Sequence, residues 1–339
     1  MLTEKQNYLR MLSGEQPEYV PQYTFGQMPG EKKLVATQMF EPPVISQHRK
    51  NNGGKDIWGV NYVATYETGN AILPEPNNFI LADITKWRDV IRAPSLDGVD
   101  WEKMVKDDME KTGIDRSQTA LALNLHMGYF QTLMSFMGFS EGLMAMFEEP
   151  DEVKALLTYI CDFYMDVADR CIDLYRPDVL TFMDDTAAWG GPFISAEMYE
   201  EFLVPCHDRW AKRGRDRGLK MTMHNCGKCE GILDLLVGMG IHMWEPAQTC
   251  NDLKAVKAKY GNKLAIAGGW DAKEHLLDPD VTAEALYASV DETFDMLAPG
   301  GGFAWCGGFL GPVGNAAVDR KNDILNRYVT EKCRGYYKS

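Results

Sequence analysis

The sequence has no apolar run long enough to span a membrane, and its first residues lack the features of a signal peptide. Positive charge is also in short supply: 35 lysines and arginines stand against 49 aspartates and glutamates, giving a formal net charge of -14. A surface of that sign repels the phosphates of nucleic acids and of anionic membranes. We therefore expect a cytoplasmic protein that binds neither nucleic acid nor a membrane.

Two further patterns that would set the protein class directly are missing. The eight cysteines show no framework spacing, so we expect reduced thiols rather than disulfides. No glycine fingerprint for a dinucleotide is present, which disfavours an open, doubly wound sheet. The remaining composition is that of an ordinary globular protein, 45% hydrophobic and 25% charged, and 339 residues are enough for a single large domain.

From about residue 118 onward, short apolar segments alternate with amphipathic helices, which predicts parallel βαβ units and an α/β fold. Strands are expected at 19–25, 120–125, 178–183, 219–223, 241–244, 263–267 and in the segment that ends at Cys306. A closed (β/α)8 TIM barrel needs one strand more than this pattern reveals. We still expect the barrel, as one domain over residues 1–339, because polar or glycine residues repeatedly follow the strand ends, where such barrels carry their active sites.

The region from about 26 to 95 is irregular and interrupted by prolines and glycines. Segments of this kind inside a compact domain are typical of lids or elaborated barrel entrances. Two short strands are expected within it, at 58–66 and 78–81. Its aromatic and methionine side chains suit an apolar ligand, although core packing would account for them as well.

The segment Met221 to Cys229 reads as a buried strand that runs into a polar turn. Side chains alternate along a strand, so His224 and Cys226 point to the same side. Zinc prefers nitrogen and sulfur ligands, and the best third ligand is Cys306, at the end of another expected strand. Cys229 is the alternative third ligand, or the partner of Cys226 in a redox pair. A core histidine beside a buried free cysteine would give the same pattern.

Two acidic residues also follow or end expected strands. Glu245 is a candidate fourth zinc ligand that substrate displaces; the alternative is a surface acid before a proline. Asp185 is a candidate for positioning a substrate or a proton, or else it caps a turn. In a barrel these residues and the three zinc ligands would converge on one end.

Four stretches carry a resemblance to a known family: Met183-Asp184-Asp185, 194–199, His224-Asn225-Cys226-Gly227 and 305–308. Over nearly its whole length the chain resembles the uroporphyrinogen decarboxylase superfamily, whose fold is a (β/α)8 barrel. True decarboxylases of that family carry an N-terminal motif whose arginines hold the substrate's carboxylates. The equivalent stretch, Gln22 to Gly30, has no arginine, so decarboxylation of uroporphyrinogen is not expected.

Within this superfamily, a His-x-Cys pair with a later Cys is similar to the zinc methyltransferases that exchange methyl groups with corrinoid proteins. The resemblance implies Zn²⁺ on His224, Cys226 and Cys306, with Glu245 in the interval where an acidic ligand can complete the site. It also implies a corrinoid, carried by a partner protein. The stretches 2–10 and 56–60 are similar to the subgroup that acts on methoxylated aromatics.

These resemblances imply a methyltransferase that moves a methyl group between a small methylated compound and a corrinoid protein. A methoxylated aromatic is the expected methyl donor, with zinc polarising the ether oxygen. The alternative is a zinc-bound thiolate as methyl acceptor, which the negative charge of two thiolates and a glutamate favours. A second alternative is a metal-free barrel, either a decarboxylase-like lyase that uses Asp185 or a protein that only binds a small ligand.

Overall fold

The computed structural model describes residues 1–24, 35–66, 71–311 and 314–338. Its main sheet has seven strands in the order β1-β5-β6-β9-β10-β11-β12, and every neighbouring pair is parallel. The strands are β1 (Thr37–Phe40), β5 (Ala120–Asn124), β6 (Val179–Met183), β9 (Lys220–His224), β10 (Met243–Ala247), β11 (Ala265–Gly269) and β12 (Phe303–Cys306). The α/β class and the parallel strands that the sequence predicts are confirmed.

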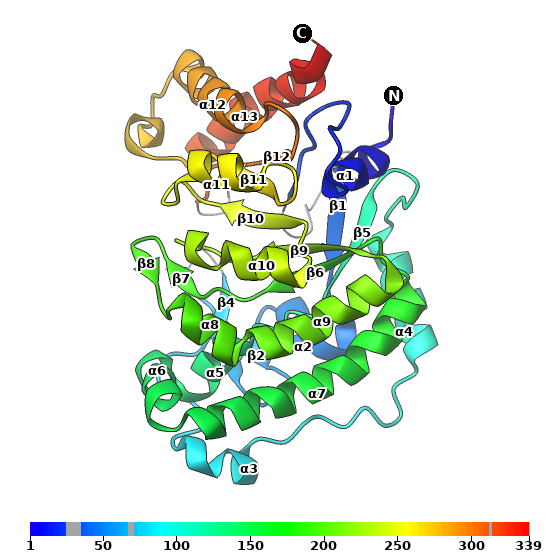
Figure 1. The fold of residues 1–339 in the computed structure, drawn as a ribbon, viewed down its shortest axis with the longest axis vertical. Helices are drawn as coiled ribbons and strands as arrows, with labels where there is room; N and C mark the ends of the chain where they lie inside the picture. Colours follow the sequence, from blue (N-terminus) through cyan, green and yellow to red (C-terminus); the bar gives the residue numbers. More distant parts are fainter. Residues whose placement is uncertain (25–34, 67–70, 312–313, 339) are drawn as a thin grey trace.

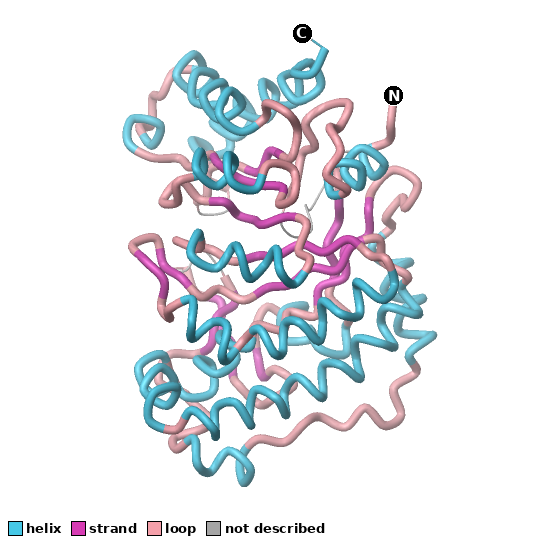
Figure 2. Tube along the Cα trace, viewed as in Figure 1, coloured by secondary structure: helices cyan, strands magenta, loops and turns pink. Residues whose placement is uncertain are grey.

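Helices cover the outside of this curled sheet (Figures 1 and 2). They are α4 (Trp101–Thr112), α5 (Tyr129–Met137), α6 (Phe139–Glu148), α7 (Pro150–Tyr175), α8 (Ala196–Phe202), α9 (Val204–Arg217), α10 (Leu233–Met239), α11 (Leu253–Tyr260), α12 (Ala283–Leu297) and α13 (Ala316–Gly335). Helix α1 (Glu4–Leu12) instead packs against the inner face of the strands. Their starts follow ordinary capping chemistry: Thr3 and Gln6 form a capping box on α1, and Ser195 caps α8. No helix in the described part of the chain is long and apolar enough to cross a membrane.

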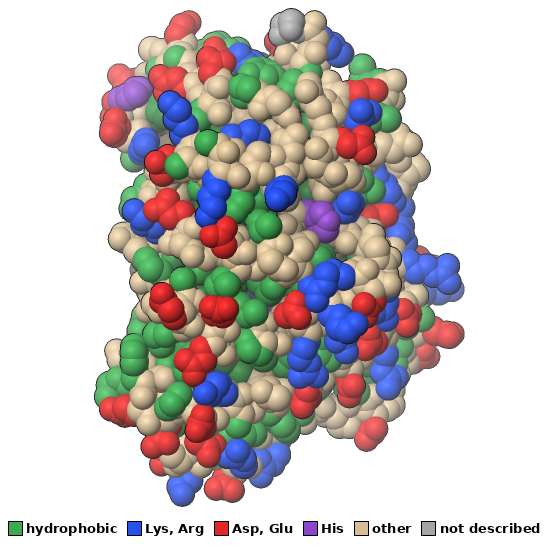
Figure 3. Space-filling view, viewed as in Figure 1, with side chains coloured by type: hydrophobic (Ala, Val, Ile, Leu, Met, Phe, Trp, Pro, Cys, Tyr) green, Lys and Arg blue, Asp and Glu red, His purple; other side chains and the backbone are tan. Residues whose placement is uncertain are grey.

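Charged side chains of both signs are intermingled on the face shown in Figure 3. Ion pairs link neighbouring helices, for example Arg209 of α9 with Asp162 of α7 at 2.7 Å. Exposed pairs of this kind contribute little to stability, about 0–1 kcal/mol each. The energy of the fold therefore comes from the buried apolar residues between helices and sheet, such as Trp210 and Trp244, which are fully buried.

The expected strand at 19–25 is present only as a short bridged segment among the described residues. The Trp305 N–H donates to the Pro21 carbonyl at 2.8 Å, and the Tyr23 N–H donates to the Trp305 carbonyl at 2.8 Å. On its other side, the Gln22 carbonyl accepts from the N–H of Ala36, one residue before β1, at 3.1 Å. The segment thus connects β12 and β1, the two edge strands of the sheet.

Part of the region predicted to be irregular is regular. Strand β1, absent from the predicted set, lies there, as do helix α2 (Pro43–Lys50) and the antiparallel sheet β2 (Gly54–Lys55), β3 (Asn61–Ala64) and β4 (Ile72–Pro74). The strand predicted at 58–66 is confirmed only at β3. The one predicted at 78–81 is wrong, because the N–H groups of Ile80 and Leu81 bond to the Phe136 carbonyl near the end of α5.

A second, smaller apolar cluster lies under the carboxyl-terminal ends of the strands. It contains one face of most strands, with small residues such as Ala122, Ala267 and Ala304, together with Tyr8 and Met11 of α1. Tyr23 belongs to the same cluster, and its ring stacks on that of Tyr8 with the centroids 6.4 Å apart. This packing supports the residues at the strand ends from below.

The remaining short elements are η1 (Ile84–Lys86), α3 (Trp87–Val90), β7 (Ala187–Ala188), β8 (Gly191–Pro192), η2 (Glu230–Ile232), η3 (Glu274–Leu277) and η4 (Tyr336–Lys338).

Candidate functional site

The expected site residues come from four parallel strands. His224 is the last residue of β9, and across the sheet it pairs with Met183 of β6 on one side and Glu245 of β10 on the other. Asp185 follows β6, Cys226 follows β9, and Cys306 ends β12. Because the strands are parallel, all these ends lie at the same edge of the sheet.

Asp185, His224 and Cys226 form a group, hereafter the donor group, whose ligand atoms all lie within 4.8 Å of one another. The His224 Nε2 atom lies 3.5 Å from the Cys226 Sγ and 3.7 Å from the Asp185 Oδ1. The backbone N–H of Cys226 also donates to Asp185 Oδ1 at 2.7 Å. A nitrogen, a sulfur and a carboxylate oxygen brought together in this way match the ligand chemistry of zinc.

Glu245 lies on the other side of the imidazole. Both of its carboxylate oxygens are 3.0 Å from His224 Nδ1, and the Tyr23 hydroxyl donates to Oε1 at 3.0 Å. The side chain is fully buried, so the alternative of a surface acid is wrong. The strand also continues through Glu245 to Ala247 instead of ending before it. That Glu245 is a zinc ligand stays a prediction.

The charges around His224 shift the pKa of its imidazole strongly. Burial lowers the pKa of the imidazole, but the Glu245 carboxylate, Cys226 and Asp185 together raise it well above the usual 6.5. Burial raises the pKa of the Cys226 thiol, an effect that His224 partly offsets. The site therefore concentrates negative charge around one ring, which is an environment that attracts a cation.

The two remaining thiols differ in their surroundings. Burial, followed by the charges of Glu245, Asp271 and Cys226, raises the pKa of Cys306 to about 12. Cys306 is outside the donor group, so its role as a ligand stays a prediction. The Cys229 thiol donates a hydrogen bond to the Cys226 backbone carbonyl at 3.0 Å. All eight cysteines are free.

Asn225, which the sequence reasoning did not single out, holds the turn between the two expected ligands, His224 and Cys226. Its side-chain oxygen accepts from the Thr186 N–H at 3.0 Å, and its amide donates to the Thr186 hydroxyl at 2.9 Å. Its own N–H donates to the Glu245 carbonyl at 2.9 Å. A fully buried asparagine with all these bonds fixes the distance between His224 and Cys226. The sequence feature that could have identified Asn225 as a site residue is its position between two expected ligands.

The two adjacent acids after β6, Asp184 and Asp185, make different contacts. Asp184 is fully buried, accepts from the N–H groups of Phe130 and Gln131 at 3.1 Å each, and lies 3.3 Å from His207 Nε2. It thus binds the first turn of α5. Asp185 reaches the donor group instead, while its Oδ2 accepts from the Gln131 side chain at 3.2 Å. Asp185 therefore contacts both α5 and Cys226, which is more than the capping of a turn.

A cavity of about 310 Å³ is lined by Asp185, the one member of the donor group that reaches it, and by residues of the small antiparallel sheet. Its walls carry the aromatic side chains of Trp58, Tyr62 and Tyr164. His126 also lines it and pairs through Nδ1 with Glu41 at 2.7 Å. His126 has a φ of 51°, in the left-handed region that side chains rarely adopt, and such backbone strain is common at functional sites.

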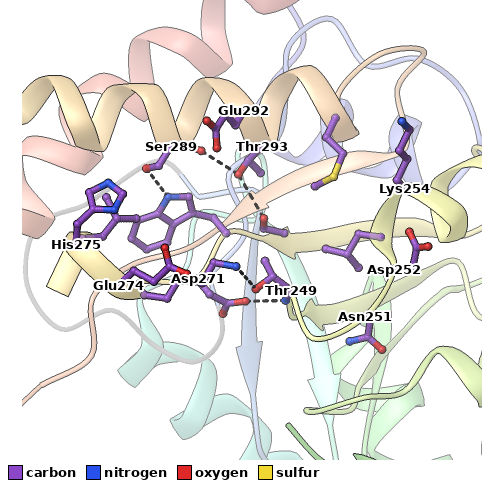
Figure 4. Close-up of a pocket in the computed structure, with 16 residues that line it drawn as sticks. Thr249, Asn251, Asp252, Lys254, Asp271, Glu274, His275, Ser289, Glu292 and Thr293 are labelled. Carbon is purple, nitrogen blue, oxygen red and sulfur yellow. Dashed lines mark hydrogen bonds between the residues drawn. The ribbon is translucent and has the colours of Figure 1, made fainter. Parts of the chain in front are cut away.

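A second cavity, of about 450 Å³, lies beside the ends of β10 and β11 (Figure 4). Asp271 points across it, and its Oδ2 accepts from the Thr249 N–H at 2.7 Å. Its lining carries side chains of both charges, including Lys254, Glu274 and Glu292, and includes no member of the donor group. The smaller cavity is therefore the candidate substrate pocket.

The chain is similar to known proteins in three comparisons. The family model described as uroporphyrinogen decarboxylase (URO-D) matches residues 121–303. A methylated-thiol–coenzyme M methyltransferase from Methanosarcina mazei is 27% identical over 143 residues, which are 41% of this chain and 35% of that protein. The chain thus matches about a third of the length of this curated relative.

Among solved structures, a methyltransferase from Methanosarcina mazei superposes with a TM-score of 0.63 at 14% sequence identity, over 98% of this chain and 99% of that one. At this identity the likeness concerns the fold alone.

Proposed function

Because the chain belongs to the uroporphyrinogen decarboxylase family, we propose that it is a zinc-dependent methyltransferase that moves a methyl group between a small methylated compound and a corrinoid protein. The observation that carries this proposal is the donor group Asp185, His224 and Cys226, next to an aromatic pocket. In the full proposal the fold is a closed (β/α)8 barrel, with the segment around Gln22 in the place of the missing strand. The protein works in the cytoplasm, where its thiols stay reduced.

The residues that would hold zinc are His224, Cys226 and Cys306, with an acidic side chain completing the set. Partly buried thiols with raised pKa values, such as Cys226 and Cys306, ionise readily only beside a cation, which fits a metal site. Zinc bound there would supply a Lewis acid for an ether oxygen or a positive charge for a thiolate.

The pocket supports a methoxylated aromatic as methyl donor. Trp58, Tyr62 and Tyr164 offer ring faces and edges against which a planar substrate can pack. A corrinoid in its cobalt(I) state would supply the electron pair for the new bond to the methyl group, and the substrate would be left as a phenolate. Asp185 lines the pocket and also belongs to the donor group, so it is placed to position the substrate beside the metal site.

A thiol as methyl acceptor or donor is the second candidate. It is favoured by the relative, whose name specifies methylated thiols and coenzyme M. The negative charge around His224 also leaves a bound zinc a modest Lewis acid, better suited to a thiolate than to an ether.

The test is a screen of methoxylated aromatics and methylated thiols with purified protein and a corrinoid protein in its cobalt(I) state. We expect a methoxylated aromatic to convert the cobalt spectrum to that of methyl-cobalt(III), at a rate that depends on the zinc content. Turnover of methylated thiols alone would replace the first candidate by the second. Turnover of neither, with zinc present, would contradict the proposed function.

Uroporphyrinogen is expected to be neither decarboxylated nor tightly bound, although the family is named for that reaction. The stretch from Gln22 to Gly30 has no arginine to pair with the substrate's carboxylates. Positions 25–30 lie outside the described residues, so this expectation rests on the sequence. Chromatography of the porphyrins after incubation would measure it, and any product above the enzyme-free control would count against the assignment.

A further inference from the structure

The buried side chains of Tyr23, Glu245 and His224 form a hydrogen-bonded row that ends at the donor group. The Tyr23 hydroxyl donates to Glu245 Oε1 at 3.0 Å, and the Glu245 carboxylate faces His224 Nδ1 at 3.0 Å. The other ring nitrogen, Nε2, faces Cys226 and Asp185. The two nitrogens of one imidazole therefore have separate surroundings, a carboxylate on one side and the remaining donors on the other.

A neutral imidazole carries one N–H donor and one lone pair. A carboxylate at Nδ1 favours the tautomer with its proton on Nδ1, since that hydrogen bond is charge-assisted. The lone pair is then on Nε2, toward the Cys226 thiol and the Asp185 carboxylate. A single cation cannot bind both nitrogens of the ring, so the Nε2 side, where the other donors lie, is the side that fits it.

We infer that Glu245, held by Tyr23, is a positioning residue that fixes the tautomer and the orientation of His224, and that it is not a zinc ligand. This inference rests on the proposed zinc site. It assigns the acidic ligand to Asp185, which lies with Cys226 on the Nε2 side. It also gives a role to Tyr23, whose segment bonds to β12 and whose hydroxyl fixes the rotation of the Glu245 carboxylate.

The decisive measurement is nitrogen-15 NMR of zinc-loaded protein with labelled histidine. We expect the His224 signals to show a proton on Nδ1 and the metal on Nε2. A proton on Nε2, with the metal on Nδ1, would overturn the inference and restore Glu245 as a candidate ligand. Wild-type protein that takes up no zinc would instead overturn the proposed function, so the two failures can be told apart.

A set of variants tests the role of each group through the zinc dissociation constant, measured by competition with a chelator. Glu245→Ala is expected to raise it about 10- to 100-fold, as losing a partner of a ligating histidine does. Glu245→Gln should restore most of the affinity, because its amide oxygen still accepts from Nδ1–H. Tyr23→Phe should have a smaller effect, about 3- to 10-fold.

Tyr8→Phe is the matched control, because Tyr8 is equally buried and stacks on Tyr23, while its hydroxyl contacts the Met243 sulfur at 3.8 Å. Its zinc affinity should match that of the wild type. Equal losses of zinc affinity in Tyr8→Phe and Tyr23→Phe would show that the effect comes from core packing, and would contradict the inference. So would a Glu245→Gln variant that binds zinc as weakly as Glu245→Ala, since an amide that still accepts from Nδ1–H would then give no benefit and the carboxylate would be acting as a ligand.

Discussion

Purified wild-type protein is expected to hold about one zinc per chain, and His224→Ala and Cys226→Ala are each expected to lose nearly all of it. Both side chains belong to the donor group, whose ligand atoms lie within 4.8 Å of one another, so removing one leaves too few ligands at the site. Metal analysis of protein purified without chelators, with the protein concentration measured in the same samples, gives the ratio directly.

Cys229→Ala is the matched control, because Cys229 is a buried thiol three residues after Cys226 that donates to a backbone carbonyl. It should keep its zinc. Zinc retained in Cys226→Ala and lost in Cys229→Ala would move the site to the other thiol. Cys306→Ala separates the two ligand sets: loss of zinc makes Cys306 a ligand, and full retention leaves Asp185 as the third donor.

The neighbouring acids Asp184 and Asp185 are expected to behave oppositely when each is changed to alanine. Asp184→Ala removes a fully buried carboxylate that accepts two backbone N–H groups of α5 and faces His207. Leaving these buried N–H groups without an acceptor lowers the free energy of unfolding by about 1–3 kcal/mol for each group. Asp185→Ala removes a partly exposed side chain and should change stability by less than about 1 kcal/mol, but should weaken zinc binding and methyl transfer.

Urea denaturation of the two variants, followed by zinc titration of each, measures this contrast. Asp184→Asn is the companion to Asp184→Ala, since its amide oxygen can still accept one of the two N–H groups, and it should recover part of the stability. Two variants that lose stability equally would show that Asp185 also supports the fold. Normal zinc affinity in Asp185→Ala would remove it from the donor group.

Local patterns in the sequence predicted much of the fold and part of the site. The alternation of a strand placed His224 and Cys226 on one side, and the apolar pattern from about residue 118 predicted the alternating strands and helices. These features depend on residues a few positions apart. Strand β1 was not predicted because it has only four residues, Thr37 to Phe40, within a region that prolines and glycines make irregular.

Features that depend on distant partners could not be derived in this way. Nothing in the local pattern around Ile80 and Leu81 reveals that their N–H groups bond to a helix carbonyl instead of a strand. Glu245 was expected at a strand end, and its contacts with His224 and Tyr23 depend on how three segments pack. Likewise, Asp184 and Asp185 are adjacent residues of the same type. The different hydrogen bonds that they make depend on how α5 packs beside them.

The bonds that Pro21 and Tyr23 make with Trp305 have a consequence for the order in which the molecule can assemble during translation. The early segment leaves the ribosome long before β12 is synthesised, and at about 5–20 residues per second it waits for many seconds. Until then one flank of Tyr23, and with it the support of Glu245, is incomplete. Nascent chains stalled before residue 303 lack both this support and Cys306, and should therefore bind zinc poorly even though His224 and Cys226 have already been synthesised.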